Sequence, residues 1–142
     1  MLFFDAEKFQ VSRYCIRYIP MGQSYRDLQA WQKSISFVKE IYSTTKTFPS
    51  DERFGLISQL RRAAVSVPSN IAEGQARYSQ REFMKFLGHA RGSLAEVETQ
   101  LTISVKLGYL SAQQYQHLES RCSELNRILN GLYASIELRA KD

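Results

Sequence analysis

The sequence has little of what marks secreted, fibrous or membrane-spanning proteins. Its 142 residues include two cysteines, three prolines and seven glycines. Two cysteines cannot form a disulfide framework, so we expect a protein of the reducing cytoplasm. Such low proline and glycine contents exclude a collagen-like or linker-rich chain. No segment approaches the roughly 18 consecutive apolar residues that a membrane-spanning helix needs, so no membrane association is expected.

Catalytic and metal-binding motifs are also scarce. Neither of the two histidines, His89 and His117, follows a glutamate by three residues, which excludes the paired motif of di-iron bundles. Gly88-x-x-x-Gly92 resembles a motif for close helix approach, and no glycine-rich phosphate loop, zinc-protease motif or nucleophile elbow is present. Cys122 falls in a helical apolar stripe and is predicted to be packed rather than a metal ligand. We therefore predict a non-enzyme without cofactor or metal.

The overall composition and length of the chain are those of one folded domain. Hydrophobic residues make up 44% of the chain and charged residues 23%, which is ordinary for globular proteins and excludes intrinsic disorder. A single core typically serves roughly 100–200 residues, so the chain fits one domain. The formal net charge of +5 permits a nucleic-acid partner without requiring one.

Residues 1–24 differ from the rest of the chain. They show no sustained helical or strand period, and Pro20 is followed by a second methionine, Met21. A signal peptide is not expected, because no basic start leads into an apolar run and a cleavage site. Two interpretations stay open. The segment is a start-site extension with Met21 as the natural first residue, or it is an arm that packs on a neighbouring subunit through the aromatic residues Phe3, Phe4, Phe9 and Tyr14. We expect it to be poorly ordered unless it docks.

Residues 25–142 predict an all-α fold, an antiparallel up-down-up-down four-helix bundle. Apolar residues recur at alternating steps of three and four, as on the buried stripe of a bundle helix. The predicted helices cover about residues 25–47, 51–74, 80–107 and 112–139. No run is typical of a strand, and the short connections make neighbouring helices antiparallel.

Capping residues mark the predicted helix starts. Ser50 is placed to cap the second helix. Ser79 with Glu82, and Ser111 with Gln114, have the spacing of capping boxes at the third and fourth helices.

Proline and glycine mark the predicted ends and one irregularity. Pro49 ends the first helix, Gly74 ends the second and Gly108 ends the third. Pro68 lies inside the second helix and should kink or restart it. Asn70 is expected to satisfy the carbonyl left unpaired by Pro68, or to cap a restarted helix.

The core stripe of the first helix is predicted to comprise Leu28, Trp31, Ile35, Val38, Tyr42 and Thr45. The other stripes run from Ile57 to Ile71, from Phe83 to Ser104 and from Tyr115 to Ile136. Further apolar rows exceed what a monomer needs and predict a homo-oligomer. These rows comprise Ala30, Phe37 and Ile41 on the first helix, with Phe86, Ile103, Val105 and Tyr133 elsewhere.

Basic charge is the one functional signal in the sequence. The segment from residue 53 to 91 has seven arginines and lysines against two carboxylates, Glu73 and Glu82. Arg77, Arg81 and Lys85 are four residues apart and would share one helix face. Arginine also suits forked contacts to phosphate.

Two interpretations of this basic segment remain open. In the first, it binds the RNA or DNA backbone, while Tyr78, Gln75 and Gln80 contact exposed bases. The candidate binding residues are Arg61, Arg62, Arg77, Arg81 and Lys85. In the second, it is a solvated face whose charges pair within the bundle, Arg81 with Glu82 or Glu73 and Glu73 with Arg77.

Several motifs resemble those of the four-helix-bundle family encoded by intervening sequences of 23S ribosomal RNA genes. They are Leu28-x-x-Trp31-Gln32-Lys33, Phe48-Pro49, the block QLRRAAVSVPSNIAEG at residues 59–74, Gly92-Ser93-Leu94-x-Glu96 and Leu107-Gly108-Tyr109-Leu110. The resemblance runs from about Leu28 to the fourth predicted helix, and the first twenty-odd residues fall outside it.

The resemblance implies a cytoplasmic, non-enzymatic ring, a homopentamer. Related bundles are accessory variability proteins of diversity-generating retroelements, whose basic pentameric barrel is thought to bind nucleic acid and the reverse transcriptase. The implied partners are therefore sister copies, RNA or DNA, and a protein such as a reverse transcriptase. Basic positions of the family block match Arg61, Arg62, Arg77 and Arg81. The alternative function is a scaffold that recruits a protein partner without binding nucleic acid.

Overall fold

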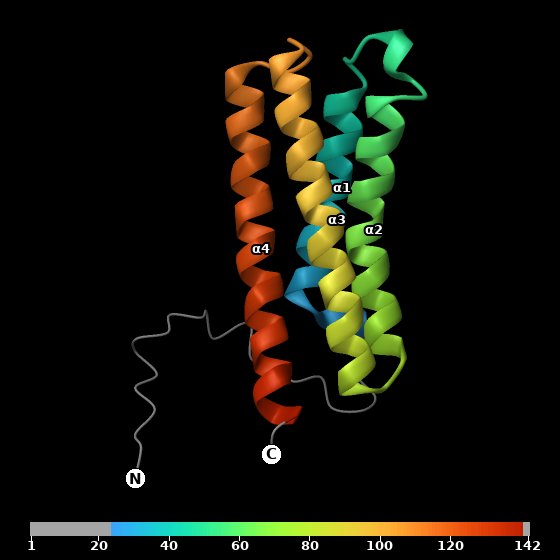
Figure 1. The fold of residues 1–142 in the computed structure, drawn as a ribbon, viewed down its shortest axis with the longest axis vertical. Coiled ribbons are helices and arrows are strands. Elements are labelled where there is room, and N and C mark those ends of the chain that lie inside the picture. Colours follow the sequence, from blue (N-terminus) through green and yellow to red (C-terminus); the bar gives the residue numbers. More distant parts are fainter. Residues whose placement is uncertain (1–23, 141–142) are drawn as a thin grey trace.

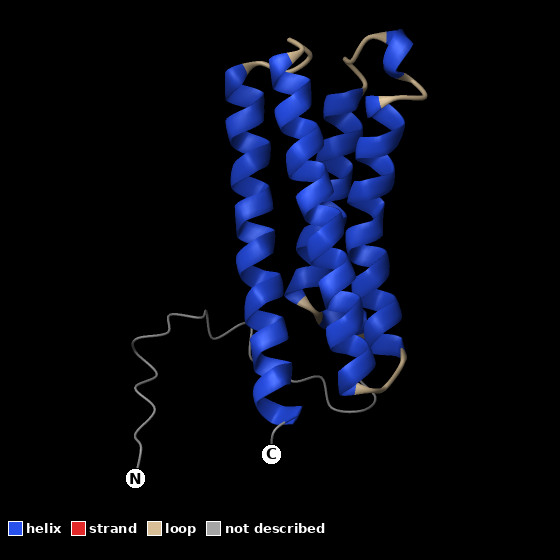
Figure 2. Ribbon diagram, in the orientation of Figure 1, coloured by secondary structure: helices blue, strands red, loops and turns tan. Residues whose placement is uncertain are grey.

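The computed structural model describes residues 24–140, which form four long helices joined by short connections (Figure 1). The four helices are α1 (Gln29–Thr45), α2 (Leu56–Ala76), α3 (Gln80–Lys106) and α4 (Ala112–Ala140). Two short 3-10 turns, η1 (Tyr25–Asp27) and η2 (Ser50–Glu52), precede α1 and α2. Figure 2 shows that residues 24–140 contain no strand.

Each helix packs against two neighbours. α1 lies between α2 and α4, and α3 lies between the same two helices on the other side. The α1–α2 and α3–α4 connections lie at one end of the bundle and the α2–α3 turn at the other (Figure 1). The fold is therefore the predicted all-α, up-down-up-down four-helix bundle. No helix in the described part of the chain combines the length and apolarity needed to cross a bilayer.

The first two helices begin later than predicted. Both interpretations of residues 1–24 fall outside the described residues except for Ser24, whose hydroxyl accepts a hydrogen bond from the Arg26 N–H and caps η1. Leu28 is extended, so α1 begins at residue 29 rather than 25. Ser50 begins η2 instead of capping α2. The Glu52 carboxylate instead accepts the Leu56 N–H at 2.8 Å, satisfying a donor of the first turn of α2.

Serine caps the starts of both α3 and α4 as expected, but the predicted capping box is complete only at α4. The Ser79 hydroxyl accepts the Glu82 N–H at 3.3 Å. At α4 both bonds of the predicted capping box form. The Ser111 hydroxyl accepts the Gln114 N–H at 3.1 Å, and the Gln114 side chain accepts the Ser111 N–H at 3.0 Å.

The prediction that Gly74 ends the second helix is wrong. α2 continues to Ala76, and Gly74 is buried against α3. A β-carbon on Gly74 would lie 2.6 Å from the Phe86 Cβ. The residue is therefore small because two helices approach closely there, not because the backbone leaves the helix.

α2 also runs through Pro68 without interruption. Because proline has no N–H, the Ala64 carbonyl receives no backbone bond from it. The prediction that Asn70 satisfies this carbonyl is wrong. The Asn70 amide donates instead to the Ser66 carbonyl at 2.7 Å and to the Ser66 hydroxyl at 2.9 Å. The Ser66 hydroxyl in turn lies 2.8 Å from that of Ser93. Asn70 thus takes part in a polar link between α2 and α3.

On α1 the predicted core stripe is right at its two ends, Leu28 and Thr45, and wrong in part between them. Ala30, Phe37 and Ile41, assigned to a subunit interface, are buried in the bundle's own core. Ile35 and Tyr42, assigned to the core, are 43% and 40% exposed. Both rows have the same helical spacing, so periodicity alone could not distinguish the face that meets α2 and α4.

Two hydroxyl side chains belong to the buried face of α1, and of these Ser34 was absent from the predicted stripe. Ser34 is buried and donates to the Trp31 carbonyl at 2.8 Å. Thr45 is buried and donates to the Ile41 carbonyl at 2.8 Å. Such bonds permit polar side chains in a core because no hydrogen-bonding group is left unpaired.

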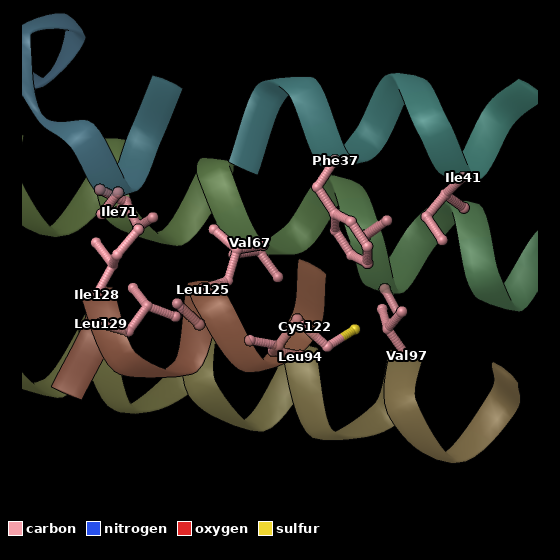
Figure 3. Close-up of a cluster of buried hydrophobic side chains, with 14 of the residues drawn as sticks. Phe37, Ile41, Val67, Ile71, Leu94, Val97, Cys122, Leu125, Ile128 and Leu129 are labelled. Carbon is pink, nitrogen blue, oxygen red and sulfur yellow. The ribbon is translucent and has the colours of Figure 1, made fainter. Parts of the chain in front are cut away.

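Side chains from all four helices meet in one core. Figure 3 shows part of it, with Phe37, Ile41, Val67, Ile71, Leu94, Val97, Cys122, Leu125, Ile128 and Leu129 labelled. Burying each large side chain stabilises the fold by about 1.5–3 kcal/mol. The stripes predicted for α2, α3 and α4 supply most of this core.

Candidate nucleic-acid interface

The candidate basic residues fall into two groups at different heights of the bundle. Arg61 and Arg62 lie in the first half of α2, beside the C-terminal end of α1. Arg77 directly follows α2, and Arg81 and Lys85 lie in the first two turns of α3. Along α2, Arg61 and Arg77 are about 24 Å apart at 1.5 Å per residue. The five residues therefore do not form one compact patch.

The Arg61 side chain links α2 to α1. Its Nε donates to the Thr45 hydroxyl at 3.0 Å, and its guanidinium carbon lies 4.5 Å from the centre of the Tyr42 ring. Its Nη2 lies 3.5 Å from the Tyr42 carbonyl, in the last turn of α1. A cation at this position also interacts favourably with the negative, C-terminal end of the α1 dipole.

Arg62 and Arg77 differ in whether the guanidinium has a partner within the described chain. Arg62 is exposed and has no hydrogen bond or ion pair with any residue in the described part of the chain. Arg77 forms the predicted ion pair with Glu73, Nη2 to Oε1 at 3.2 Å, and its guanidinium lies 5.3 Å from the centre of the Phe86 ring. The pair is exposed on both sides, so its net contribution to stability is small.

Arg81 and Lys85 line an open groove between α3 and α4. The groove has a volume of about 540 Å³ and is lined by Arg81, Met84, Lys85, Gly88, Arg91 and Tyr133. Three of these six residues are cations and none is a carboxylate. Arg81 forms an ion pair with neither Glu82 nor Glu73 in the described chain, while the predicted pair of Glu73 with Arg77 does form. The groove therefore presents cations without a counter-charge among its lining residues.

Four of the six lining residues, Met84, Gly88, Arg91 and Tyr133, were absent from the predicted site. The Arg91 guanidinium lies 5.4 Å from the centre of the Tyr133 ring, an arrangement typical of a cation–π contact. Arg91 was detectable in sequence as a further cation on α3, ten residues after Arg81. Tyr133 was not, because its place depends on how α4 packs along α3. Its ring is half-buried at this groove rather than part of a separate apolar row.

The Gly88-x-x-x-Gly92 motif makes no close approach within the bundle. A β-carbon on either glycine would meet nothing within 4 Å. Both glycines face outward on α3, and Gly88 leaves the floor of the groove uncovered. The chain's own close approach is at Gly74 instead.

Tyr78 lies in the α2–α3 turn, three residues before Arg81. Its φ of 52° lies in the left-handed region, which is uncommon for a residue with a β-carbon. The side chain is 70% exposed and lies in sequence between Arg77 and Arg81. An exposed aromatic ring next to cations suits stacking on a base.

The cysteine and the two histidines of the described chain are packed or paired with neighbouring side chains. The Cys122 thiol is buried in the core, and burial, followed by the charges of Glu98 and Glu119, raises its pKa to about 12. His117 pairs with Glu40 at 3.4 Å, and His89 packs edge-on against Phe86. Among residues 24–140, no three histidine, cysteine or acidic side chains gather as a metal site would require.

Comparisons with known proteins agree with this architecture. Residues 26–131 match the sequence profile of the family described as 23S rRNA-intervening sequence protein. A solved structure of similar fold is a protein of unknown function from the S23 ribosomal protein family of Bacteroides thetaiotaomicron. It is 24% identical, with a TM-score of 0.69, and the match covers 74% of this chain and 95% of that one. No curated protein matches the sequence.

Proposed function

This chain belongs to the 23S rRNA-intervening sequence protein family, and from that premise we propose that it is a non-enzymatic oligomer that binds the RNA or DNA backbone. The observation that supports binding is the α3–α4 groove, where Arg81, Lys85 and Arg91 are together without a carboxylate among the lining residues. Phosphate groups are contacted mainly by such side chains, and neutralising them releases counterions.

The proposed surface extends from the groove to the α2–α3 turn. Arg77 and Tyr78 precede Arg81 in the chain, and both are exposed. Arg61 is left out of this surface because its guanidinium is bonded to α1. Arg62 is exposed but stands at a different height, so we assign it a smaller share of the affinity.

The absence of catalysis is part of the same proposal. The descriptions of the family and of its structural relative name no reaction. The one cysteine in the described chain, Cys122, has a pKa near 12 and stays a buried neutral thiol.

An exposed apolar stripe supports the oligomeric part of the proposal. Trp31, Ile35, Val38 and Tyr42 follow one side of α1, and Ile35 and Tyr42 are over a third exposed. Val65 of α2 is 39% exposed and lies one turn from Arg61, which contacts Tyr42. Contiguous exposed apolar surface is typical of subunit interfaces. We propose that sister copies cover this stripe, five in all as the resemblance implies.

Light scattering coupled to size-exclusion chromatography tests the assembly. We expect a particle several times the 16.4 kDa chain, and Ile35→Glu should reduce its mass by placing a charge in the interface. Ser36→Glu adds the same charge at an exposed position about 100° around the helix from Ile35, and it should leave the mass unchanged. A 16.4 kDa particle at working concentration would contradict the oligomer.

Fluorescence anisotropy with short labelled RNA and DNA tests the binding. We expect affinity to fall steeply as salt rises, with a slope of about one unit per phosphate contact. Arg81→Glu should weaken binding about tenfold or more, the scale of one charge-assisted hydrogen bond. Lys39→Glu makes the same change in net charge away from the groove and should have little effect. If the wild-type protein binds neither nucleic acid at low salt, the scaffold function is favoured instead.

A further inference from the structure

The α3–α4 groove holds two kinds of group at different positions along α3. Arg81 and Lys85 stand one turn apart near the start of the helix. Arg91 is ten residues beyond Arg81, about 15 Å along the axis, and there its guanidinium lies over Tyr133 of α4. Arg81 and Lys85 thus have no cation–π contact in the described chain, whereas Arg91 has one with Tyr133.

The ring-paired part of the groove is open to solvent. Arg91 is exposed while Tyr133 is half-buried, so the guanidinium covers the ring from the solvent side. Gly88 lies beside them with no atom within 4 Å of where its β-carbon would be. Met84 adds an apolar, adaptable wall. A planar guanidinium supported by a ring is a surface on which another flat group can stack.

A base inside a duplex cannot use such a surface. In a duplex the faces of each base are covered by its neighbours and only the edges are exposed, whereas an unpaired base offers both faces. Stacking on an aromatic or guanidinium plane is tolerant of sequence because every base has such a face. The groove thus combines phosphate-binding cations with a stacking surface, as in proteins that bind single strands.

From this arrangement we propose that the α3–α4 groove binds an unpaired nucleotide of a single strand. The phosphates contact Arg81 and Lys85, and the base stacks on the Arg91–Tyr133 pair. This inference rests on the proposed nucleic-acid binding and adds that single strands bind more tightly than duplexes. Of the acidic residues on α4, Glu137 follows Tyr133 by one turn, but its side chain does not line the groove.

The ligand can be altered instead of the protein, which avoids any effect on folding. Wild-type protein is titrated with a labelled single strand, with its duplex, and with the same strand made abasic at several positions. We expect the intact strand to bind about five-fold or more tightly than both others, the scale of stacking one base. Equal affinity for the intact and abasic strands would overturn the proposal, and so would equal or tighter binding of the duplex.

Two substitutions assign the effect to the groove. Arg91→Lys keeps the charge but removes the plane, and Tyr133→Leu removes the ring while keeping apolar bulk at a half-buried site. Both should lower affinity for the intact strand about five-fold and leave that for the abasic strand unchanged. Tyr133→Phe keeps the ring and should bind as the wild type does. If Arg91→Lys retains full preference for the intact strand, the groove is not the stacking site.

A free nucleotide has the same phosphate and base chemistry, so a separate arm distinguishes it from a strand. Adenosine monophosphate should compete with the labelled strand only weakly, because it offers one phosphate instead of several. Competition at the strand's own affinity would overturn the assignment to a strand. Failure of the proposed function looks different, because there neither strand nor duplex binds wild-type protein at all.

Discussion

Phe86 of α3 lies directly over Gly74 of α2, and together they set the spacing of the two most closely packed helices. A β-carbon on the glycine would be 2.6 Å from the Phe86 Cβ and 3.1 Å from Cδ2 of Phe83. The nearer contact cannot be relieved by a flexible side-chain end, since the Phe86 Cβ is attached directly to the α3 backbone. The helices can approach this closely only where a side chain is missing.

Gly74→Ala should therefore destabilise the fold. Overpacking at this contact is expected to lower the free energy of unfolding by about 1–3 kcal/mol, because α2 and α3 must move apart. The matched control is Gly92→Ala in α3, where a β-carbon meets no atom within 4 Å. That change should raise stability by roughly 0.5–1 kcal/mol through helix propensity. Chemical denaturation of both variants measures the difference, and the same sign for both would refute this account.

The two isoleucines of α1 test which apolar row faces the core. Ile41 is fully buried and Ile35 is 43% exposed. Ile41→Ala should lower the free energy of unfolding by about 2–5 kcal/mol, as in other cores. Ile35→Ala should cost less than about 1 kcal/mol at concentrations low enough to keep the chain monomeric. A larger cost for Ile35→Ala would mean that the original assignment of the rows was right.

Adjacent arginines on α2 should have separable effects. Arg61 bonds to the last turn of α1, so Arg61→Gln should reduce stability by about 1–2 kcal/mol, the scale of one hydrogen bond and one cation–π contact. Arg62 is exposed and Arg62→Gln should change stability by less than about 0.5 kcal/mol. Thermal melts measure the first effect. Anisotropy titrations should then show no greater loss of nucleic-acid affinity for Arg61→Gln than for Arg62→Gln.

The ion pair between α1 and α4 predicts a pH dependence. Lys33 Nζ lies 2.8 Å from Glu124 Oε1, and this hydrogen bond is the main reason that the pKa of Glu124 falls below its ordinary value of 4.5. Because the folded state holds the carboxylate ionised, the stabilisation is present above pH 4.5 and is lost as the pH falls below it.

The matched variants are Lys33→Met and Lys39→Met on the same helix. At pH 7 we expect Lys33→Met to lower the free energy of unfolding by roughly 0.5 kcal/mol, as for other partly exposed pairs. The deficit relative to wild type should shrink as acid protonates Glu124. Lys39 has no ion pair with a described residue, so any effect of Lys39→Met should not change with pH. A Lys33→Met deficit that persists unchanged in acid would contradict the pairing.

The helical architecture could be predicted from the sequence because its signals are local. Steps of three and four between apolar residues mark a helix face, and Ser79 and Ser111 mark helix starts through bonds within one turn. The basic segment was visible for the same reason, since Arg77, Arg81 and Lys85 recur every four residues. A motif block of 16 residues also made the family recognisable.

Only the tertiary structure decided which residues meet across helices. The spacing of apolar residues on α1 does not distinguish whether Ile35 or Ile41 faces the core. That depends on where α2 and α4 lie beside α1. Gly74 resembles a helix end until Phe86 is seen against it. Tyr133 joins the groove only through the register of α4 on α3, more than forty residues from Arg91 in the chain. Spacing along one helix specifies its faces, but the partner of each face depends on contacts between distant segments.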